Sequence, residues 1–239
     1  MSKVLADASD KARLQMAALS YEPAQYVEGC VEFCGLVLAV DHRALIPRFE
    51  TERLVRSIEQ WCGKTDPQKS WRIADIGTGS GAIAIALAKR IPNAQLFASD
   101  ISPAALDLAR RNAKRHGIDH KIRFSEGSLL EPLPDRIDII AANLPYIPTR
   151  HLAALDPSVR DWEPRMALDG GSDGFDLYRA LLDQISRRPQ KPSLVLLEID
   201  DNQAECARME CARRLPDVPY VIEKDSSGLT RYVTLANPL

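Results

Sequence analysis

The sequence lacks long apolar runs, has few aromatic residues and carries no excess of basic charge. No stretch of about 18 consecutive apolar residues occurs, so we expect no membrane-spanning helix. The start of the chain also lacks the layout of a secretory signal, and we therefore expect a cytoplasmic protein. The formal net charge of −2 disfavours a surface built to bind nucleic-acid phosphates, without excluding a local basic patch.

Cysteine and histidine are too few and too scattered to predict a metal site or a disulfide framework. The five cysteines are an odd number, and no two of them form a C-x-x-C pair. The four histidines do not gather near them. We therefore expect no bound metal, and free thiols at Cys30, Cys34, Cys62, Cys206 and Cys211.

A regular alternation of apolar strands and helices begins at Trp71. The 239 residues suffice for one large α/β domain with a small appendage. Strands that alternate with helices predict a mostly parallel sheet with helices on both faces, and the closing hairpin predicts an antiparallel last strand. The seven expected strands cover residues 72–76, 94–99, 121–124, 137–142, 193–199, 219–223 and 230–235.

Two less regular segments precede this sheet. Residues 2–19 have the pattern of a modest amphipathic helix, and residues 32–40 predict a hairpin bent at Gly35. We therefore expect an N-terminal helical segment over residues 1–28. The main domain is expected over residues 29–239, with the hairpin at residues 31–45 as its first part.

The first strand of the sheet leads into the glycine-rich turn Asp75-Ile76-Gly77-Thr78-Gly79-Ser80-Gly81, which opens a helix. Glycine permits a tight turn and lets a ligand approach the backbone. The G-x-G-x-G spacing is one residue tighter than the dinucleotide-binding fingerprint, which favours a nucleoside that carries an amino acid rather than a pyrophosphate. Asp100 ends the second strand, where an acid accepts ribose hydroxyls in nucleotide-binding sheets. Alone, the loop is equally compatible with a structural strand-to-helix turn.

The fourth strand ends in Asn143-Leu144-Pro145-Tyr146, at the sheet edge where open α/β proteins bind ligands. The Asn143 side-chain carbonyl and the Leu144 backbone carbonyl could accept the two hydrogens of a planar amino group. The ring of Tyr146 could pack on its π system. The tetrapeptide therefore predicts a site for an amide or an exocyclic amine. A plain strand end followed by a turn is the simpler alternative for these four residues alone.

Together these segments resemble class I S-adenosylmethionine-dependent methyltransferases, in particular the HemK/PrmC-type glutamine N5-methyltransferases of peptide-chain release factors. The resemblance runs from about Glu22 to Leu235 and includes residues 45–52 and 163–174. It implies a Rossmann-like fold, S-adenosylmethionine as methyl donor, S-adenosylhomocysteine as product, and a release factor with a Gly-Gly-Gln loop as partner. It places the cofactor at Asp75, Gly77, Thr78, Gly79, Ser80, Gly81, Asp100, Ile101, Ser128, Leu129 and Asn143, and the acceptor glutamine at Asn143, Leu144, Pro145 and Tyr146.

The chain departs from the family pattern at several points. Leu144 replaces the first of two prolines, Phe49 replaces another proline, and Ser128-Leu129 replaces an acid and an aromatic beside the adenine. The N-terminal helical domain that docks the release factor is reduced to about one helix. Three functions remain open: glutamine methylation in a protein, N6-adenine methylation of RNA or DNA, and donor binding without turnover. The acidic charge balance makes a nucleic-acid partner the weaker prediction, and Asn-Leu-Pro-Tyr is the feature that favours it.

Overall fold

The computed structural model describes residues 21–237, and the helix expected over residues 2–19 lies outside this range. The described chain begins with helix α2 (Ala24–Glu28) and a separate two-stranded hairpin of β1 (Cys30–Phe33) and β2 (Leu36–Ala39). Helix α3 (Glu52–Thr65) then leads into the main sheet. The hairpin turns at Gly35, which has a φ of 76°, as the sequence predicts.

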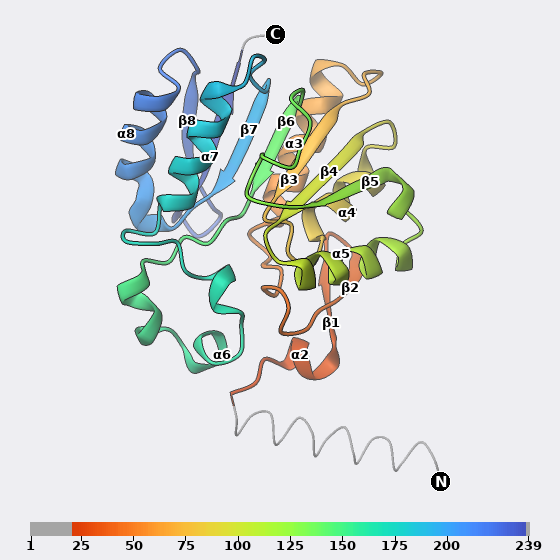
Figure 1. The fold of residues 1–239 in the computed structure, drawn as a ribbon, viewed down its shortest axis with the longest axis vertical. Coiled ribbons are helices and arrows are strands. Elements are labelled where there is room, and N and C mark those ends of the chain that lie inside the picture. Colours follow the sequence, from red (N-terminus) through yellow and green to blue (C-terminus); the bar gives the residue numbers. More distant parts are fainter. Residues whose placement is uncertain (1–20, 238–239) are drawn as a thin grey trace.

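The main sheet has seven strands in the order β5-β4-β3-β6-β7-β9-β8. All neighbouring pairs are parallel except those made by β9, which runs antiparallel between β7 and β8. The predicted mostly parallel seven-stranded sheet with an antiparallel last strand is therefore confirmed (Figure 1). Its strands are β3 (Arg72–Ile76), β4 (Gln95–Asp100), β5 (Ile122–Glu126), β6 (Ile139–Ala142), β7 (Leu194–Glu198), β8 (Tyr220–Lys224) and β9 (Thr230–Ala236).

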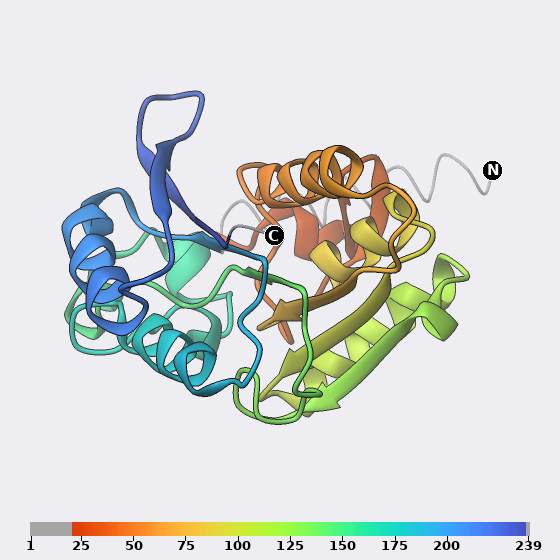
Figure 2. The ribbon, with the colours of Figure 1, turned by 90° about the horizontal axis from the view of Figure 1, so that it is seen from above.

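Two buried clusters cover the two faces of this sheet, because successive strand residues point to opposite sides. Ile73 and Ile139 pack in a core with helices α3, α4 (Ala82–Arg90) and α5 (Pro103–Arg115). Ala74 and Ile140 pack in a second core with α7 (Asp176–Arg187) and α8 (Ala204–Arg214). Figure 2 shows α3 and α4 on one side of the sheet and α7 and α8 on the other. The predicted three-layer arrangement is therefore confirmed.

Short turns rather than long helices join β6 to α7. They are η2 (Thr149–Ala154), α6 (Pro157–Arg160) and η3 (Arg165–Ala167); η1 (Asp119–Lys121) and η4 (Asp201–Gln203) occur elsewhere. In Figure 1 this segment and the β1–β2 hairpin lie below the sheet, beyond the carboxyl ends of the parallel strands. Of the helices within residues 21–237, none is long and apolar enough to cross a membrane.

Candidate active site

Strand register brings three predicted segments to one edge of the sheet. Ile76 pairs with Ser99 on one side and with Ala142 on the other, so Gly77, Asp100 and Asn143 follow at the same level. The sheet also reverses direction here, because the chain runs outward from β3 through β4 and β5, and then from β6 through β7. Such a switch point is where open α/β sheets bind ligands.

The glycine turn is fastened to β4 by backbone hydrogen bonds. The amides of Gly77 and Thr78 both donate to the Ser99 carbonyl, at 2.9 and 3.0 Å. Gly77 has a φ of +69°, and a Cβ added there would come within 2.9 Å of the Leu144 side chain. The turn thus passes directly against the tetrapeptide, and a side chain at its first glycine would strain the backbone and displace the Leu144 side chain.

Asp75 and Gly81 stabilise this turn without lining the cavity. Asp75 is buried, and its Oδ2 accepts bonds from the Thr78 hydroxyl at 2.6 Å and the Ala84 amide at 3.1 Å. Burial raises the pKa of Asp75 to about 6, against the effect of these two bonds. A Cβ on Gly81 would meet Ile85 and Ala109, so this glycine lets α4 approach α5. Neither residue is among the described residues that line the cavity beside the turn.

Asp100 lies at the cavity wall, where its carboxylate shapes the turn. Oδ2 accepts from the Gly79 amide and Oδ1 from the Ser102 amide, both at 2.9 Å. Each carboxylate oxygen keeps a lone pair for a further donor. Burial raises the pKa of Asp100, and the backbone amides of Ser102, Gly79 and Ile101 oppose that shift.

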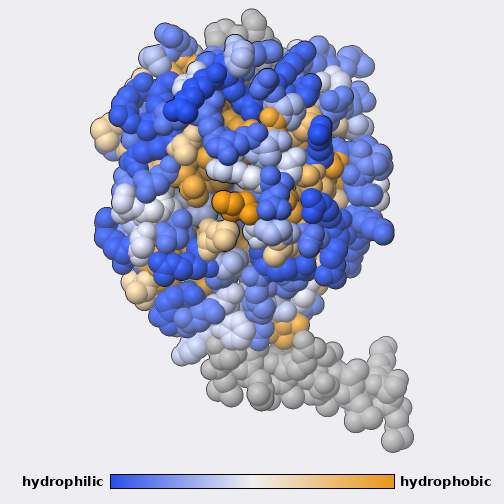
Figure 3. Space-filling view, viewed as in Figure 1, coloured by the Kyte–Doolittle hydropathy of each residue, from blue (hydrophilic) through white to orange (hydrophobic). Residues whose placement is uncertain are grey.

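A cavity of about 820 Å³ opens between these segments, within the usual size range of small-molecule sites. In Figure 3 apolar residues gather near the middle of a mostly hydrophilic face, level with the carboxyl ends of the strands in Figure 1. The predicted residues that line the cavity are Gly77, Thr78, Gly79, Ser80, Asp100, Ile101, Ser128, Leu129, Asn143, Leu144 and Pro145.

Other segments of the wall are ones to which the sequence assigns no site residue. One is the loop between β2 and α3, which contributes Arg43 and Leu45. Another is the segment between β6 and α7, which contributes Met166 and Gly171. Thr51, just before α3, also lines the cavity. The resemblance covers parts of these segments, but only the folded chain brings them to the same edge of the sheet.

Asn143 is held in one orientation. Its Nδ2 donates to the Thr51 hydroxyl at 3.0 Å, and its Oδ1 accepts no hydrogen bond from the described residues. The Leu144 amide donates to the Tyr178 hydroxyl at 3.1 Å, and the same hydroxyl is within hydrogen-bond distance, 3.2 Å, of the Leu144 carbonyl, which it donates to. That hydroxyl also donates to the Glu198 carbonyl and has only one proton. Since a carbonyl oxygen has two lone pairs, the Leu144 carbonyl keeps capacity for a further donor. Two oxygens with free lone pairs therefore stand at consecutive residues.

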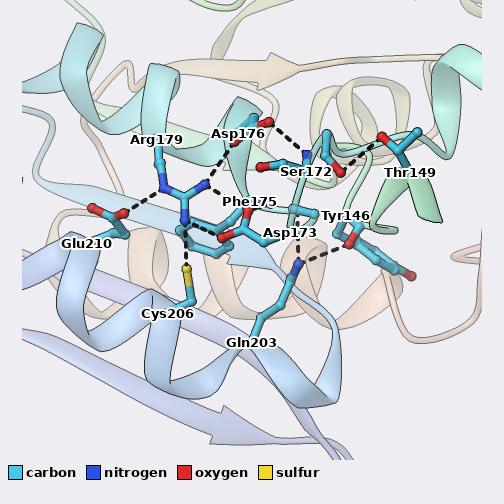
Figure 4. A network of polar contacts seen from close by, with 12 residues as sticks. Tyr146, Thr149, Ser172, Asp173, Phe175, Asp176, Arg179, Gln203, Cys206 and Glu210 are labelled. Carbon is cyan, nitrogen blue, oxygen red and sulfur yellow. Dashed lines mark hydrogen bonds and ion pairs between the residues drawn. The ribbon is translucent and has the colours of Figure 1, made fainter. Parts of the chain in front are cut away.

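Tyr146 is placed differently from the stacking role that the sequence suggests. It is not among the described residues that line the cavity. Its backbone carbonyl accepts from Gln203 Nε2 at 3.0 Å, and the same Nε2 donates to the Gly174 carbonyl at 2.9 Å (Figure 4). Burial raises the pKa of Tyr146 to about 12. The tyrosine thus fixes the exit of the tetrapeptide onto the loop that carries Gly174.

A charged network holds that loop in place. Arg179 on α7 donates to both Asp173 oxygens, to Asp176, and to Glu210 on α8 (Figure 4). The Thr149 hydroxyl donates to Asp169 at 2.6 Å. The Arg179 guanidinium lowers the pKa of Asp173 to about 2, so this acid is ionised at neutral pH. The loop from β6 to α7 is therefore tied to both helices of its face.

The cavity wall fits a nucleoside that carries an amino acid. The Ser80 hydroxyl is buried and has no hydrogen-bond partner among the described residues, and it lies beside the open backbone of the glycine turn. Asp100 offers further acceptor capacity at the next strand end. No group of three or more histidine, cysteine or acidic side chains within residues 21–237 could hold a metal ion.

Comparison with solved structures places the fold among methyltransferases. The hMettl16 catalytic domain in complex with a MAT2A 3'UTR hairpin superposes with a TM-score of 0.70 at 14% identity, over 91% of this chain and 83% of that one. A ribosomal protein L11 methylase from Lactobacillus delbrueckii gives a TM-score of 0.56 at 21% identity, over 80% of each chain. These likenesses concern the fold alone.

Sequence relatives are much nearer. The family described as the Methyltransferase small domain matches residues 54–155. A release factor glutamine methyltransferase of Geobacter sulfurreducens is 46% identical over 77% of this chain, which spans 63% of that relative. The relatives of that name in Deinococcus radiodurans and Streptococcus pneumoniae are 39% and 37% identical, over 88% and 92% of this chain and 73% and 76% of their own lengths. The chain therefore belongs to the release factor glutamine methyltransferase family.

Proposed function

We propose that this protein methylates the side-chain amide nitrogen of a glutamine in a protein, with a peptide-chain release factor as substrate and S-adenosylmethionine as donor. The observation that carries the proposal is the pair of acceptor oxygens at Asn143 and Leu144, each with a lone pair left for a further donor, next to a cavity bordered by the glycine turn. The name of these relatives, release factor glutamine methyltransferase, supports the release factor as substrate. A Gly-Gly-Gln loop would present the glutamine.

The cofactor is supported by the wall of the cavity and by one structural neighbour. The N-terminal domain of human METTL16, in complex with SAH, has a TM-score of 0.60 to this chain. The turn residues Gly77 to Ser80 would hold the amino-acid part, and Asp100 would accept the ribose hydroxyls. Ile101, Ser128 and Leu129 would border the base. When bound, S-adenosylmethionine supplies an electrophilic methyl group on a sulfonium sulfur.

The protein's contribution to the reaction is positioning of the amide. Asn143 Oδ1 and the Leu144 carbonyl would each accept one N–H hydrogen, which raises electron density on nitrogen and aims it at the methyl group. Asn143 and Leu144 would keep the nitrogen aligned with the methyl group that a bound donor would supply, and the methylated amide would release its extra proton to water. Alignment of this kind lowers barriers by on the order of 7–11 kcal/mol in well-oriented systems.

A labelled-methyl assay tests the proposal with three acceptors offered in parallel: a release factor with a Gly-Gly-Gln loop, bulk RNA and DNA. We expect label in the release factor alone, and none when the loop glutamine is replaced by alanine. Label confined to nucleic acid would instead identify an N6-adenine methyltransferase. Donor binding without any label would identify a protein that has lost turnover.

Asn143→Ala tests the division of labour within the site. We expect transfer to fall by roughly a hundredfold or more, as when a single stabilising polar group is removed from an active site. Donor affinity, measured by calorimetry, should change little. The matched control is Asn93→Ala, because Asn93 is exposed and lies outside the cavity wall. An equal loss of donor binding and transfer would contradict the assignment of Asn143 to the acceptor.

A further inference from the structure

Glu198 is a buried acid with no role in the mechanism above. It ends β7, and the pairing of Ala142 with Leu197 places it level with Asn143 on the neighbouring strand. Only 1% of the residue is exposed, and its Oε2 has no hydrogen-bond partner among the described residues. An ionisable group is costly to bury, so a buried acid beside Asn143 is expected to have a function.

Thr51 connects this acid to Asn143. Thr51 is 4% exposed and precedes α3, which packs on the same sheet. Its hydroxyl receives the Asn143 Nδ2–H at 3.0 Å. Hydrogen bonding from the same hydroxyl opposes the effect of burial on the pKa of the Glu198 carboxyl group, which places the two side chains next to each other. A threonine hydroxyl has one proton. Since Thr51 accepts from Asn143, its proton is available for Glu198.

Because Thr51 has a single proton to donate, the orientation of the Asn143 amide depends on whether Glu198 is ionised. An ionised carboxylate can only accept, so it engages the Thr51 proton and leaves the Thr51 oxygen to accept from Asn143. Asn143 must then direct its NH₂ to Thr51 and its Oδ1 away from Thr51. A protonated Glu198 can itself donate to Thr51, which frees the Thr51 proton for Asn143 Oδ1 and favours the opposite rotamer of the amide.

The other half of the acceptor pair is attached to the same residue. The Glu198 backbone carbonyl accepts from the Tyr178 hydroxyl, and that hydroxyl receives the Leu144 amide at 3.1 Å. Glu198 therefore contacts Asn143 through Thr51 and Leu144 through Tyr178. Its backbone supports one acceptor, and its side chain sets the direction of the other.

We propose that Glu198 is a positioning residue which, when ionised, acts through Thr51 to hold the Asn143 carbonyl toward the methyl acceptor. The inference rests on the proposed function, because it assigns Asn143 Oδ1 to the glutamine amide. Protonation of Glu198 turns the Asn143 NH₂ toward the substrate's own NH₂, and two donors then face each other. Transfer therefore requires the ionised form and declines as pH falls.

The surroundings of Glu198 place this change near neutral pH. Burial raises its pKa to about 7, and the nearby Glu50 acts in the same direction. The Thr51 hydroxyl, Arg231 and Arg48 lower the pKa by a smaller amount. The remaining titratable groups that interact with the carboxylate are Tyr146 after β6, Tyr178 on α7 and Tyr232 on β9.

The kinetic test compares pH profiles of kcat/KM for transfer to the release factor in four variants and the wild type. We expect an acidic limb near pH 7 in the wild type. Glu198→Gln should lower kcat roughly ten- to hundredfold and remove this limb, because misplaced polar groups cost up to about that much. Thr51→Val should do the same, whereas Thr51→Ser, which keeps the hydroxyl, should retain the limb. Glu59→Gln on the outer side of α3 makes the same chemical change away from the site and should follow the wild type.

A second readout needs no substrate. The chain has only five asparagines, at positions 93, 112, 143, 202 and 237, so selective ¹⁵N labelling resolves the Asn143 side-chain amide by NMR. We expect the Asn143 NH₂ signal to titrate with a midpoint near the kinetic limb in the wild type and Thr51→Ser, and not in Glu198→Gln or Thr51→Val.

The outcomes separate the two proposals. If the wild type labels no release factor, the proposed function fails, and the NMR titration still decides the coupling of Glu198 to Asn143. If the wild type labels it but Glu198→Gln and Thr51→Val keep the acidic limb and the titrating signal, the role of Glu198 is overturned. Should Glu198→Gln fail to fold, the Thr51→Val and Thr51→Ser pair gives the same decision.

Discussion

Gly174 shows how closely the backbone around the site is packed. It has a φ of +84°, and a Cβ added to it would come within 2.1 Å of the Tyr146 carbonyl and 2.7 Å of Gln203 Nε2. Those two atoms form the hydrogen bond that fixes the exit of the tetrapeptide. Gly228, in the β8–β9 turn, has a φ of +83° and nothing within 4 Å of the same added atom. The two glycines share a conformation and differ in their surroundings.

We therefore expect Gly174→Ala and Gly228→Ala to behave differently. Both variants bear the left-handed backbone cost of about 1–2 kcal/mol. Gly174→Ala adds a steric clash of roughly 1–3 kcal/mol and displaces Tyr146, so transfer activity should fall as well. Urea unfolding and the labelled-methyl assay measure the two effects. Equal stability and equal activity for both variants would mean that contact with Tyr146 has no consequence.

The raised pKa of Glu198 also predicts how the stability of the folded protein depends on pH. Its pKa is raised from 4.5 to about 7 by burial, so the folded protein holds a proton that the unfolded chain releases between these values. The folded state is therefore favoured at low pH and loses this contribution as pH rises through 7. The free energy of unfolding of Glu198→Gln minus that of wild type should therefore be larger at pH 8 than at pH 5, by on the order of 1–3 kcal/mol. Urea unfolding at the two pH values measures the difference, and a pH-independent difference would contradict it.

Single residues were the hardest part of the site to predict. Asn143 carried a recognisable signal because it follows an apolar strand and precedes proline. Thr51 lies in a segment that the resemblance covers and Glu198 ends a predicted strand, but nothing in the sequence gives either residue a role at the site. Their hydrogen bonds to the site depend on the pairing of β6 with β7 and on the packing of α3, which no local pattern encodes. Tyr146 was recognised but lies outside the described cavity wall, since its position depends on Gln203.

At the scale of elements, Asn112 joins three parts of the molecule. It is fully buried in α5 and donates to the carbonyls of Ala39 in β2 and Ser80 in the glycine turn, both at 2.9 Å. Its Oδ1 accepts from the Ala39 amide at 2.8 Å. One side chain therefore holds the hairpin, the helix and the turn together.

Asn112→Ala should loosen this junction. Three backbone groups, the partly buried amide and carbonyl of Ala39 and the buried carbonyl of Ser80, would lose their partner. We expect a loss of roughly 2–4 kcal/mol in the free energy of unfolding. Hydrogen exchange should accelerate at the Ala39 amide before it does in β3. Asn93→Ala changes the same residue type at an exposed position and should alter stability by less than about 0.5 kcal/mol. Unchanged exchange at Ala39 would show that the hairpin is held by other contacts.

Helices and strands with regularly spaced apolar residues are predictable from the sequence, whereas segments held by tertiary contacts are not. Serine followed by proline is a common start of a helix, and the Ser102 side chain at the start of α5 accepts from the Ala105 amide. Residues 147–171 have no sustained period, and the structure holds them through a bridge between Ile147 and Asp169 and through short turns. They contribute Met166 and Gly171 to the cavity, which only the folded chain brings beside the tetrapeptide.

At the scale of the whole molecule, the cavity lies where the two halves of the sheet diverge. The glycine turn and Asp100 come from the β3–β5 half, and Asn143 and Leu144 come from the first strand of the other half. The proposed donor and acceptor sites would therefore be built from different segments that meet at Gly77 and Leu144. A change in one half can alter donor binding while the acceptor pair keeps its own hydrogen bonds, and the reverse also holds.

This separation predicts how ligand binding changes thermal stability. A ligand at 100 times its Kd stabilises the folded state by about 2.7 kcal/mol, which corresponds to roughly 5–10 °C in Tm for a chain of this size. S-adenosylhomocysteine should produce this shift in the wild type and in Glu198→Gln, because Glu198 acts on the acceptor side. Asp100→Ala should reduce the shift strongly, since it removes the acid expected at the ribose and the partner of the Gly79 amide. Scanning calorimetry of the three proteins at equal ligand concentration measures these shifts in Tm. An undiminished shift in Asp100→Ala would exclude this acid from the donor site. A lost shift in Glu198→Gln would show that the two halves do not act separately.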